Sequence, residues 1–169
     1  MKTAKTCILL FAAMSLLTAL PCLAADEVAF TGTEAACLTC VCPDCNPGTW
    51  EKESTLVRNW EWVYLYTASD PRGAGYLRVE VNWSLDASFN GPAWGRFYSC
   101  DASGNRTADG WEGTWNGQIY GFFPSYNWIA NNIAHGIGVY KGQKMEFTTA
   151  YGNSFTGTTV GTIKDVGKE

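Results

Sequence analysis

The sequence predicts an all-β protein in which antiparallel strands follow one another as a meander and close into a small barrel of about eight strands. Strand-like segments bounded by turn residues recur roughly every ten residues after Trp50, a spacing typical of all-β domains. Glycines repeat two or four positions apart within several of these segments, as tight bending around a barrel requires. Examples are Gly113 and Gly117, Gly136 and Gly138, and Gly157 and Gly161. A two-layered β-sandwich is the alternative architecture.

The segment 111–121 shows strand alternation and regularly spaced glycines together. Residues two apart lie on the same face of a strand. One face would carry Trp111, Gly113, Trp115, Gly117 and Ile119, and the other Glu112, Thr114, Asn116, Gln118 and Tyr120. This pattern predicts a strongly curved strand whose two indole rings face a concave interior.

The other strands are predicted from the same alternation. Segment 59–66 is aromatic on one face, and segment 76–86 alternates apolar and polar residues without interruption. Further strands are expected at 93–100, 133–140, 144–151 and 154–163, joined by short turns. Segment 122–132 interrupts this rhythm and is interpreted as a longer aromatic connection. No amphipathic helix is expected in the mature chain.

The first residues have the pattern of a secretory signal peptide. A short basic stretch precedes an apolar run from Cys7 to Leu20, and small residues follow. We therefore interpret 1–24 as a signal peptide, 25–48 as an irregular cysteine-rich leader and 49–169 as the β-barrel domain. The apolar run is shorter than the roughly 20 residues of a membrane-spanning helix, and no second run follows. The expected location is the periplasm or the exterior of the cell.

The charge of the chain argues against some partners. Sixteen acidic residues outnumber twelve basic ones, which gives a formal net charge of −4. The lysines and arginines form no cluster along the sequence. An acidic surface without a basic patch disfavours binding to nucleic acid or to an anionic membrane.

Four closely spaced cysteines are the most specific chemical feature of the leader. Their spacing is C-x2-C-x-C-x2-C, formed by Cys37, Cys40, Cys42 and Cys45. In an exported chain we expect disulfides, and three pairings are open. A zinc site is the alternative, although structural zinc sites usually separate their two C-x2-C pairs by a dozen or more residues. A redox-active pair is a further alternative. Cys100 either pairs with the leader or stays a buried thiol.

Aromatic residues supply the candidate ligand site. Because a barrel encloses a space between its inward faces, the inward rings are expected either to line a pocket for an apolar or aromatic ligand or to fill the core. The candidate ligand-binding residues are Trp83, Trp111, Trp115, Tyr140 and Phe147.

No catalytic residue is predicted. His135 is the only histidine, and the sequence places no partner beside it, as a general base requires. Glu80, Glu112 and Glu146 fall on predicted outward faces, where a solvated carboxylate is the ordinary state. No metal cofactor other than zinc at the cysteines is indicated.

Three short motifs resemble a known group of barrels. Segment 135–142 (His-Gly-Ile-Gly-Val-Tyr-Lys-Gly) resembles a strand and turn of the allene oxide cyclase and dirigent group, which are calycin-like, eight-stranded barrels. Segment 157–163 is similar to their closing strand, and segment 110–117 looks like a strand of exported barrels of this type. The resemblance covers roughly 75–163 and implies a closed barrel with an apolar cavity. No functional residue of that group matches a position here, so none is transferred.

These observations lead to one expected function and two alternatives. We expect an exported, non-catalytic barrel that binds a small hydrophobic or aromatic ligand. The alternatives are a cyclase-like enzyme that uses the same cavity and an aromatic carbohydrate-binding β-sandwich. A pocket requires Trp111 and Trp115 to face inward around a void, whereas a carbohydrate site requires a flat, exposed row of rings.

Overall fold

The computed structural model describes residues 26–121, 127–152 and 156–167. Nine strands and two short 3-10 turns account for its regular structure. They are β1 (Glu27–Ala36), β2 (Pro47–Glu51), β3 (Leu56–Ala68), η1 (Pro71–Gly73), β4 (Gly75–Ser84), β5 (Gly91–Cys100), β6 (Gly110–Tyr120), β7 (Asn127–Ile137), η2 (Gly138–Tyr140), β8 (Gln143–Gly152) and β9 (Thr156–Asp165).

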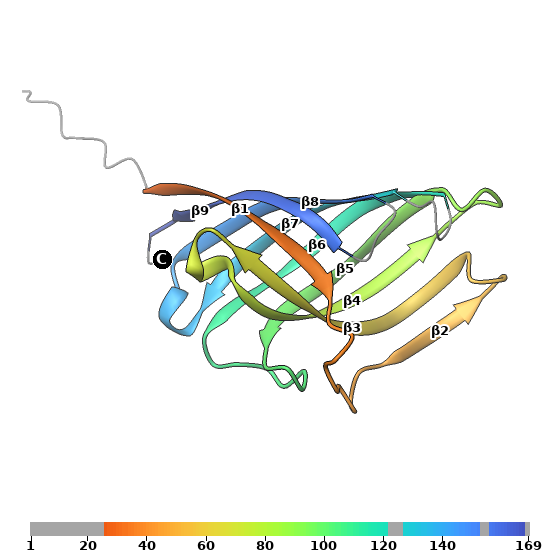
Figure 1. Ribbon diagram of the computed structural model, residues 1–169, viewed down its shortest axis with the longest axis horizontal. Coiled ribbons are helices and arrows are strands. Elements are labelled where there is room, and N and C mark those ends of the chain that lie inside the picture. The colour runs from red at the N-terminus through yellow and green to blue at the C-terminus, as the bar shows by residue number, and fades with distance from the viewer. Residues whose placement is uncertain (1–25, 122–126, 153–155, 168–169) are drawn as a thin grey trace, which may run out of the picture.

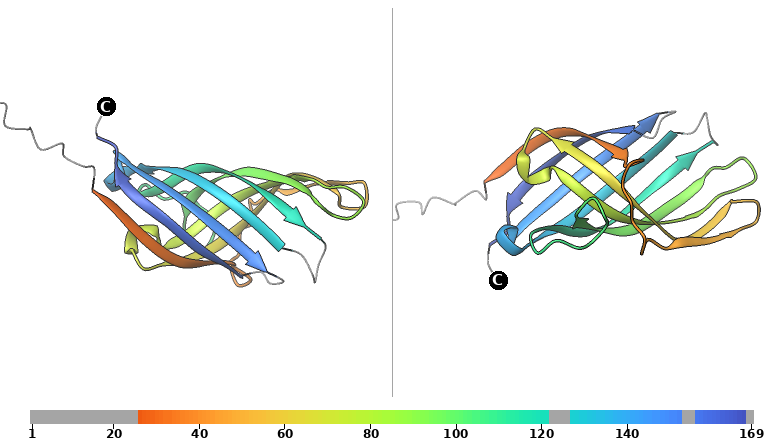
Figure 2. Two further views of the ribbon diagram at one scale, coloured as in Figure 1. Left: turned by 90° about the horizontal axis from the view of Figure 1, so that it is seen from above. Right: turned by 60° about the horizontal axis from the view of Figure 1, so that its bottom comes forward.

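Eight of the strands form a closed antiparallel barrel, which confirms the predicted fold class (Figures 1 and 2). The strands from β3 to β9 pair in sequence order, and β1 pairs with both β9 and β3 to close the sheet. Strand β2 lies outside the barrel and pairs with the first half of β3. Because the sheet closes on itself, the sandwich alternative is wrong.

The closing strand β1 corrects the prediction that all of 25–48 is an irregular leader. It pairs with β9 from Glu27 to Ala35 and with β3 from Gly32 to Ala36. Its residues are mostly small or polar, so the sequence of this strand shows no hydrophobic alternation. It is identified as a strand by its pairing with β9 on one side and β3 on the other. Residues 37–46, which carry the cysteines, contain no strand or helix, as expected.

Strand β7 also begins earlier than predicted. It starts at Asn127, within the segment interpreted as a connection, and ends at Ile137. Three asparagines (Asn127, Asn131 and Asn132) weaken its strand signal, because asparagine is depleted in strands. The rest of the predicted strand, up to Tyr140, is the turn η2. Residues 122–126 of the predicted connection lie outside the described residues.

The core consists of the inward-facing side chains, including both tryptophans of β6. Trp111 is 3% exposed and Trp115 is 4% exposed, which confirms the face assignment made for 111–121. Glycine on the neighbouring strand makes room for Trp115. A Cβ atom at Gly95 would lie 1.8 Å from the carbonyl oxygen of Glu80 and 2.7 Å from the Trp115 Nε1 atom. That nitrogen donates a hydrogen bond to the same carbonyl at 3.0 Å.

The end of the barrel that carries η1 and η2 is closed by packed side chains. The indole of Trp111 stacks on Tyr140, with 5.5 Å between ring centroids and 13° between ring planes. Trp111 Nε1 also donates a hydrogen bond to the carbonyl of Arg72 in η1, at 2.7 Å. Asp70 caps η1 and forms an ion pair with Arg72. These contacts pack side chains across this end, which is called the closed end below.

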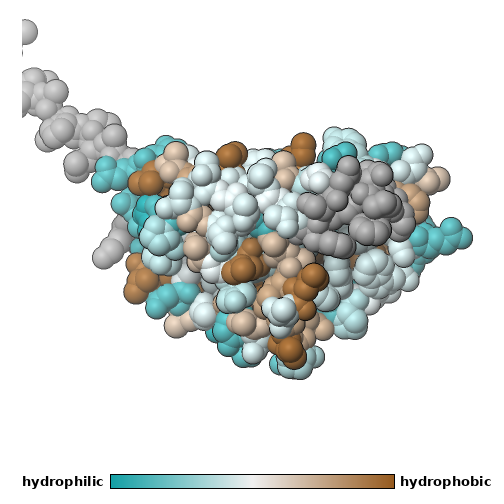
Figure 3. All heavy atoms as spheres, viewed as in Figure 1, coloured by the Kyte–Doolittle hydropathy of each residue, from teal (hydrophilic) through white to brown (hydrophobic). Residues whose placement is uncertain are grey.

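The outer surface is mixed in polarity. On the face shown in Figure 3, hydrophobic side chains occur in small groups among polar residues. The described residues include no helix long and apolar enough to cross a membrane.

Candidate functional site

A cavity of about 400 Å³ opens at the end of the barrel opposite η1 and η2, called the open end below. It arises because β3 is longer than its partner β1. The last pair between them joins Ala36 to Tyr64, and β3 extends eight residues further toward Leu56. Trp62, which points inward along that extension, is 36% exposed. The described lining residues are Ala36, Leu38, Ser54, Trp60, Trp62, Tyr64, Trp83, Leu85, Phe89, Ile119, Gly121, Trp128 and Tyr151.

Two groups of aromatic rings form the walls of this cavity. On one side Trp60 contacts Trp83 edge to face, with centroids 6.1 Å apart, and Trp50 packs on both from outside the lining. On the other side Trp128 stacks on Tyr151 at 5.2 Å. Edge-to-face and offset contacts of this kind fix the orientation of aromatic rings. The walls are therefore pre-formed.

Few polar groups border the cavity. Among the described lining residues none carries a charge, and Ser54 is the one small polar side chain. Trp83 Nε1 donates to the Ser54 carbonyl at 2.8 Å. Trp128 Nε1 is buried and has no hydrogen-bond partner within the described part of the chain. The cavity suits an uncharged, largely apolar molecule.

A buried carboxyl lies beneath the cavity floor. Glu34 of β1 is 7% exposed and points into the barrel, where it accepts a hydrogen bond from the Tyr66 hydroxyl. Removal from water raises the pKa of Glu34, and hydrogen bonds from Tyr151, Tyr66 and Thr149 offset part of that rise. It borders a small void of about 10 Å³, which shares Tyr64, Trp128 and Tyr151 with the larger cavity.

The five predicted ligand-binding residues are distributed between the two ends and the core. Trp83 lines the large cavity. Trp115 borders the small void, and Phe147 packs against Phe30, Tyr66 and Phe97 in the core. Trp111 and Tyr140 stack on each other at the closed end. The expected pocket around Trp111 and Trp115 is therefore replaced by a cavity farther along the barrel.

Three important residues of the open end were absent from the predicted site. Trp60 and Trp62 belong to the aromatic face predicted for 59–66, which is not part of the predicted pocket. Trp128 falls in the predicted connection 122–132, whereas in the structure β7 carries it into the barrel. The alternating aromatic pattern of 59–66 was the available signal.

The four leader cysteines form two disulfides, Cys37–Cys40 and Cys42–Cys45. This agrees with the disulfide prediction and selects one of the three pairings. With all four thiols oxidised, no thiolate is available to bind zinc. No cluster of three or more metal-binding side chains occurs among the described residues.

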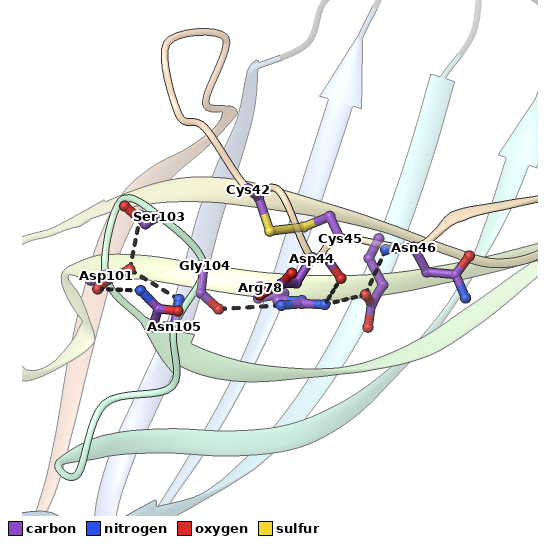
Figure 4. Close-up of a disulfide and its surroundings, with 10 residues drawn as sticks. Cys42, Asp44, Cys45, Asn46, Arg78, Asp101, Ser103, Gly104 and Asn105 are labelled. Atoms are coloured by element: carbon purple, nitrogen blue, oxygen red, sulfur yellow. Dashed lines mark hydrogen bonds and ion pairs between the residues drawn. A yellow bond between two sulfur atoms is a disulfide. The ribbon is translucent and has the colours of Figure 1, made fainter.

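The second disulfide is held against the barrel wall by Arg78 of β4 (Figure 4). The guanidinium donates to the Asp44 carbonyl at 2.7 Å and to Glu61 at 2.5 Å. Cys42 packs on Gly104, where a Cβ atom would lie 2.4 Å from the Cys42 sulfur. These contacts attach the segment between β1 and β2 to the outside of the barrel.

The remaining candidates lie away from the cavity. Cys100 is a buried free thiol, and burial raises its pKa to about 11. His135 is exposed on the outer face of β7. The three glutamates predicted to face outward do so and form ion pairs with arginines or lysines; they are Glu80, Glu112 and Glu146.

Comparison of the chain with protein families, curated proteins and solved structures finds no match in any of the three.

Proposed function

We propose that this barrel binds a small, mainly apolar ligand in the cavity at its open end, without catalysing a reaction. The observation that carries the proposal is the cavity of about 400 Å³, since its walls combine tryptophan, tyrosine, leucine and isoleucine side chains. Small-molecule sites are typically concave, largely apolar and of this size. Flat aromatic walls favour a ligand with an aromatic ring.

We further propose that the protein acts outside the cytoplasm, in the periplasm or after secretion. Two disulfides support this proposal, because such bonds persist in oxidising compartments. The signal-like pattern at 1–24 supports it independently. The relationship to the allene oxide cyclase and dirigent barrels also remains a proposal, supported by the closed eight-stranded sheet and its apolar cavity.

The cyclase-like alternative would need an acid or base that reaches the ligand. Glu34 is the nearest candidate, because burial raises its pKa and favours the neutral acid. Its carboxyl borders the small void, and the large cavity has Tyr64, Trp128 and Tyr151 in its floor and wall instead. This separation favours binding over catalysis.

A matched pair of substitutions in β1 tests the proposal. Ala36 lines the cavity, whereas its neighbour Ala35 faces outward because strand residues alternate. Ala36→Phe should fill part of the cavity and weaken binding of the neutral dye N-phenyl-1-naphthylamine about tenfold or more. Ala35→Phe should leave the affinity near that of the wild type. Dye fluorescence measures binding, and circular dichroism verifies that both variants fold.

The proposal fails if the wild-type protein does not bind such neutral aromatic dyes. It also fails if Ala36→Phe and Ala35→Phe bind the dye equally well, since the dye would then lie elsewhere.

A further inference from the structure

The buried carboxyl of Glu34 and the large cavity share part of their surroundings. Glu34 borders the small void, and this void has Tyr64, Trp128 and Tyr151 in common with the cavity. The side chain of Tyr151 also forms a hydrogen bond with the Glu34 carboxyl. The same aromatic side chains therefore border both the space proposed for the ligand and the void beside this buried acid.

The surroundings of Glu34 contain no positive charge to balance a carboxylate. Strand β3 contributes Tyr64 and Tyr66 to the wall of the void, and β8 contributes Tyr151. The described residues that β4, β5, β6 and β7 contribute include no Asp, Glu, His, Lys or Arg. An ionised Glu34 would therefore depend on hydrogen bonds and on water for its stabilisation.

The hydroxyl groups that bond Glu34 keep the same charge over the ordinary pH range. Burial raises the pKa of Tyr66 and the pKa of Tyr151 well above the usual value, so both phenols stay neutral. Thr149 is the third partner, and its hydroxyl lies 3.0 Å from that of Thr159 on β9. Glu34 is therefore the member of this cluster whose charge changes with pH.

Filling the cavity should make a carboxylate at Glu34 less stable. The void of about 10 Å³ has room for roughly one water molecule. Water in the cavity of about 400 Å³, beyond the shared aromatic rings, would screen the charge further. An apolar ligand displaces that water and lowers the local dielectric constant, which favours the neutral acid over the carboxylate.

We infer that ligand binding in the cavity is linked to the protonation of Glu34, so that the ligand binds tightly while Glu34 is neutral and is released when Glu34 loses its proton. The inference rests on the proposed binding function and adds its regulation by pH. Because linkage between two sites is reciprocal, a bound ligand should in turn make Glu34 harder to ionise.

The affinity of the intact protein for a neutral dye, measured against pH, tests the inference. Equilibrium dialysis with N-phenyl-1-naphthylamine between about pH 4 and pH 9 gives the Kd, and circular dichroism verifies the fold at each pH. The Kd should rise about fivefold or more with increasing pH. Since one proton is involved, the rise should not exceed about tenfold per pH unit.

Two substitutions of glutamate by glutamine assign the effect to one carboxyl. Glu34→Gln stays neutral at every pH, so its Kd should remain near the low-pH value of the wild type throughout. Glu146→Gln is the matched control, because Glu146 forms ion pairs with Lys144 and Lys164 on the outer face of the barrel. This control should keep the pH dependence of the wild type.

Proton uptake by the wild type tests the same linkage without any variant. Titration calorimetry in two buffers of different ionisation enthalpy counts the protons that are taken up with the dye. Uptake should be greatest at the pH where the Kd changes most steeply, and it should not exceed about one proton per dye molecule. This measurement decides the question even if Glu34→Gln folds poorly.

The outcomes separate the proposed function from its regulation. If the dye does not bind to the wild type at any pH, the proposed function fails. If the dye binds but its Kd is independent of pH, or if Glu34→Gln reproduces the pH dependence of the wild type, the linkage is wrong and the binding function stands. A Kd that falls with rising pH would also overturn the linkage, since the cavity would then favour the ionised carboxyl.

Discussion

The two ends of this barrel contain similar residues and differ in how they are filled. At the closed end the Trp111 indole is stacked on Tyr140 and bonded to the Arg72 carbonyl. At the open end Trp60, Trp83 and Trp128 surround a space of about 400 Å³. Aromatic residues therefore serve as core at one end and as the wall of a cavity at the other.

Strand length explains the difference. At the closed end the turns η1 and η2 bring Arg72 and Tyr140 onto Trp111. At the open end β1 stops at Ala36, and the chain leaves the barrel through the disulfide-bonded segment 37–46. The extension of β3 pairs with β2, which lies outside the barrel. Inward rings on this extension therefore have a barrel strand, β4, on one side only.

Truncation of one tryptophan at each end should give the largest contrast. Trp111→Ala should lower the free energy of unfolding by about 3–5 kcal/mol, because it removes a buried, stacked ring. Trp83→Ala should cost about half as much, since Trp83 is half-buried and already borders empty space, and it should weaken dye binding. Urea unfolding followed by circular dichroism measures both. Equal losses of unfolding free energy in the two variants would mean that the open end is packed as tightly as the closed end.

Removal of either disulfide should have a smaller effect on stability, and only Cys37–Cys40 should also affect the cavity. Each closes a loop whose cysteines are three positions apart, so the chain-entropy estimate is roughly 2 kcal/mol per bond. Replacing Cys37 and Cys40 by serine releases Leu38 at the cavity rim and should weaken dye binding. The matched change at Cys42 and Cys45 should affect stability alone, because Arg78 holds that loop away from the cavity.

Mass spectrometry gives a direct check on the cysteines. Protein purified without reductant should be four hydrogens lighter than the fully reduced form and should carry no metal. A fully reduced protein that contains one zinc ion would restore the metal alternative.

Much of the fold could be predicted because the information was local. The alternation of β4 and β6 assigns each residue to a face, and the structure confirms that Trp111 and Trp115 point inward. Strand β1 could not be recognised in this way, because its inward positions include Gly32, Glu34 and Ala36. Its place depends on pairing with β9 and β3, which is visible only when the barrel closes.

The candidate site was harder to predict for a different reason. Alternation shows that Trp83, Trp111 and Trp115 share the interior, but it does not give their heights along the barrel axis. Those heights depend on the stagger between neighbouring strands. The stagger places Trp83 at the open end and Trp111 at the closed end, so a list of inward rings does not define one pocket.

Glu34 lies between the two ends, and its ionisation gives the smallest predicted change in the stability of the fold. Burial raises the pKa of Glu34 in the folded protein above the unfolded value of about 4.3. The folded state therefore binds its proton more tightly, and the associated stability is fully present below that unfolded value. This stability is lost as the pH rises through the folded pKa, by at most about 1.4 kcal/mol per pH unit.

Glu34→Gln should remove this decline, since glutamine stays neutral at every pH. Urea unfolding of the wild type and the variant at several pH values between 2 and 9 would show this difference, with the stability of the Glu34→Gln variant rising relative to the wild type as the pH increases. Glu146→Gln is the control of opposite sign. Hydrogen bonds from Lys144 and Lys164 lower the pKa of Glu146 to about 2, so its contribution is lost as the pH falls. If the two substitutions altered the same side of the pH profile, Glu34 would be ionised in the folded barrel, and its carboxylate would place a negative charge directly beneath the cavity.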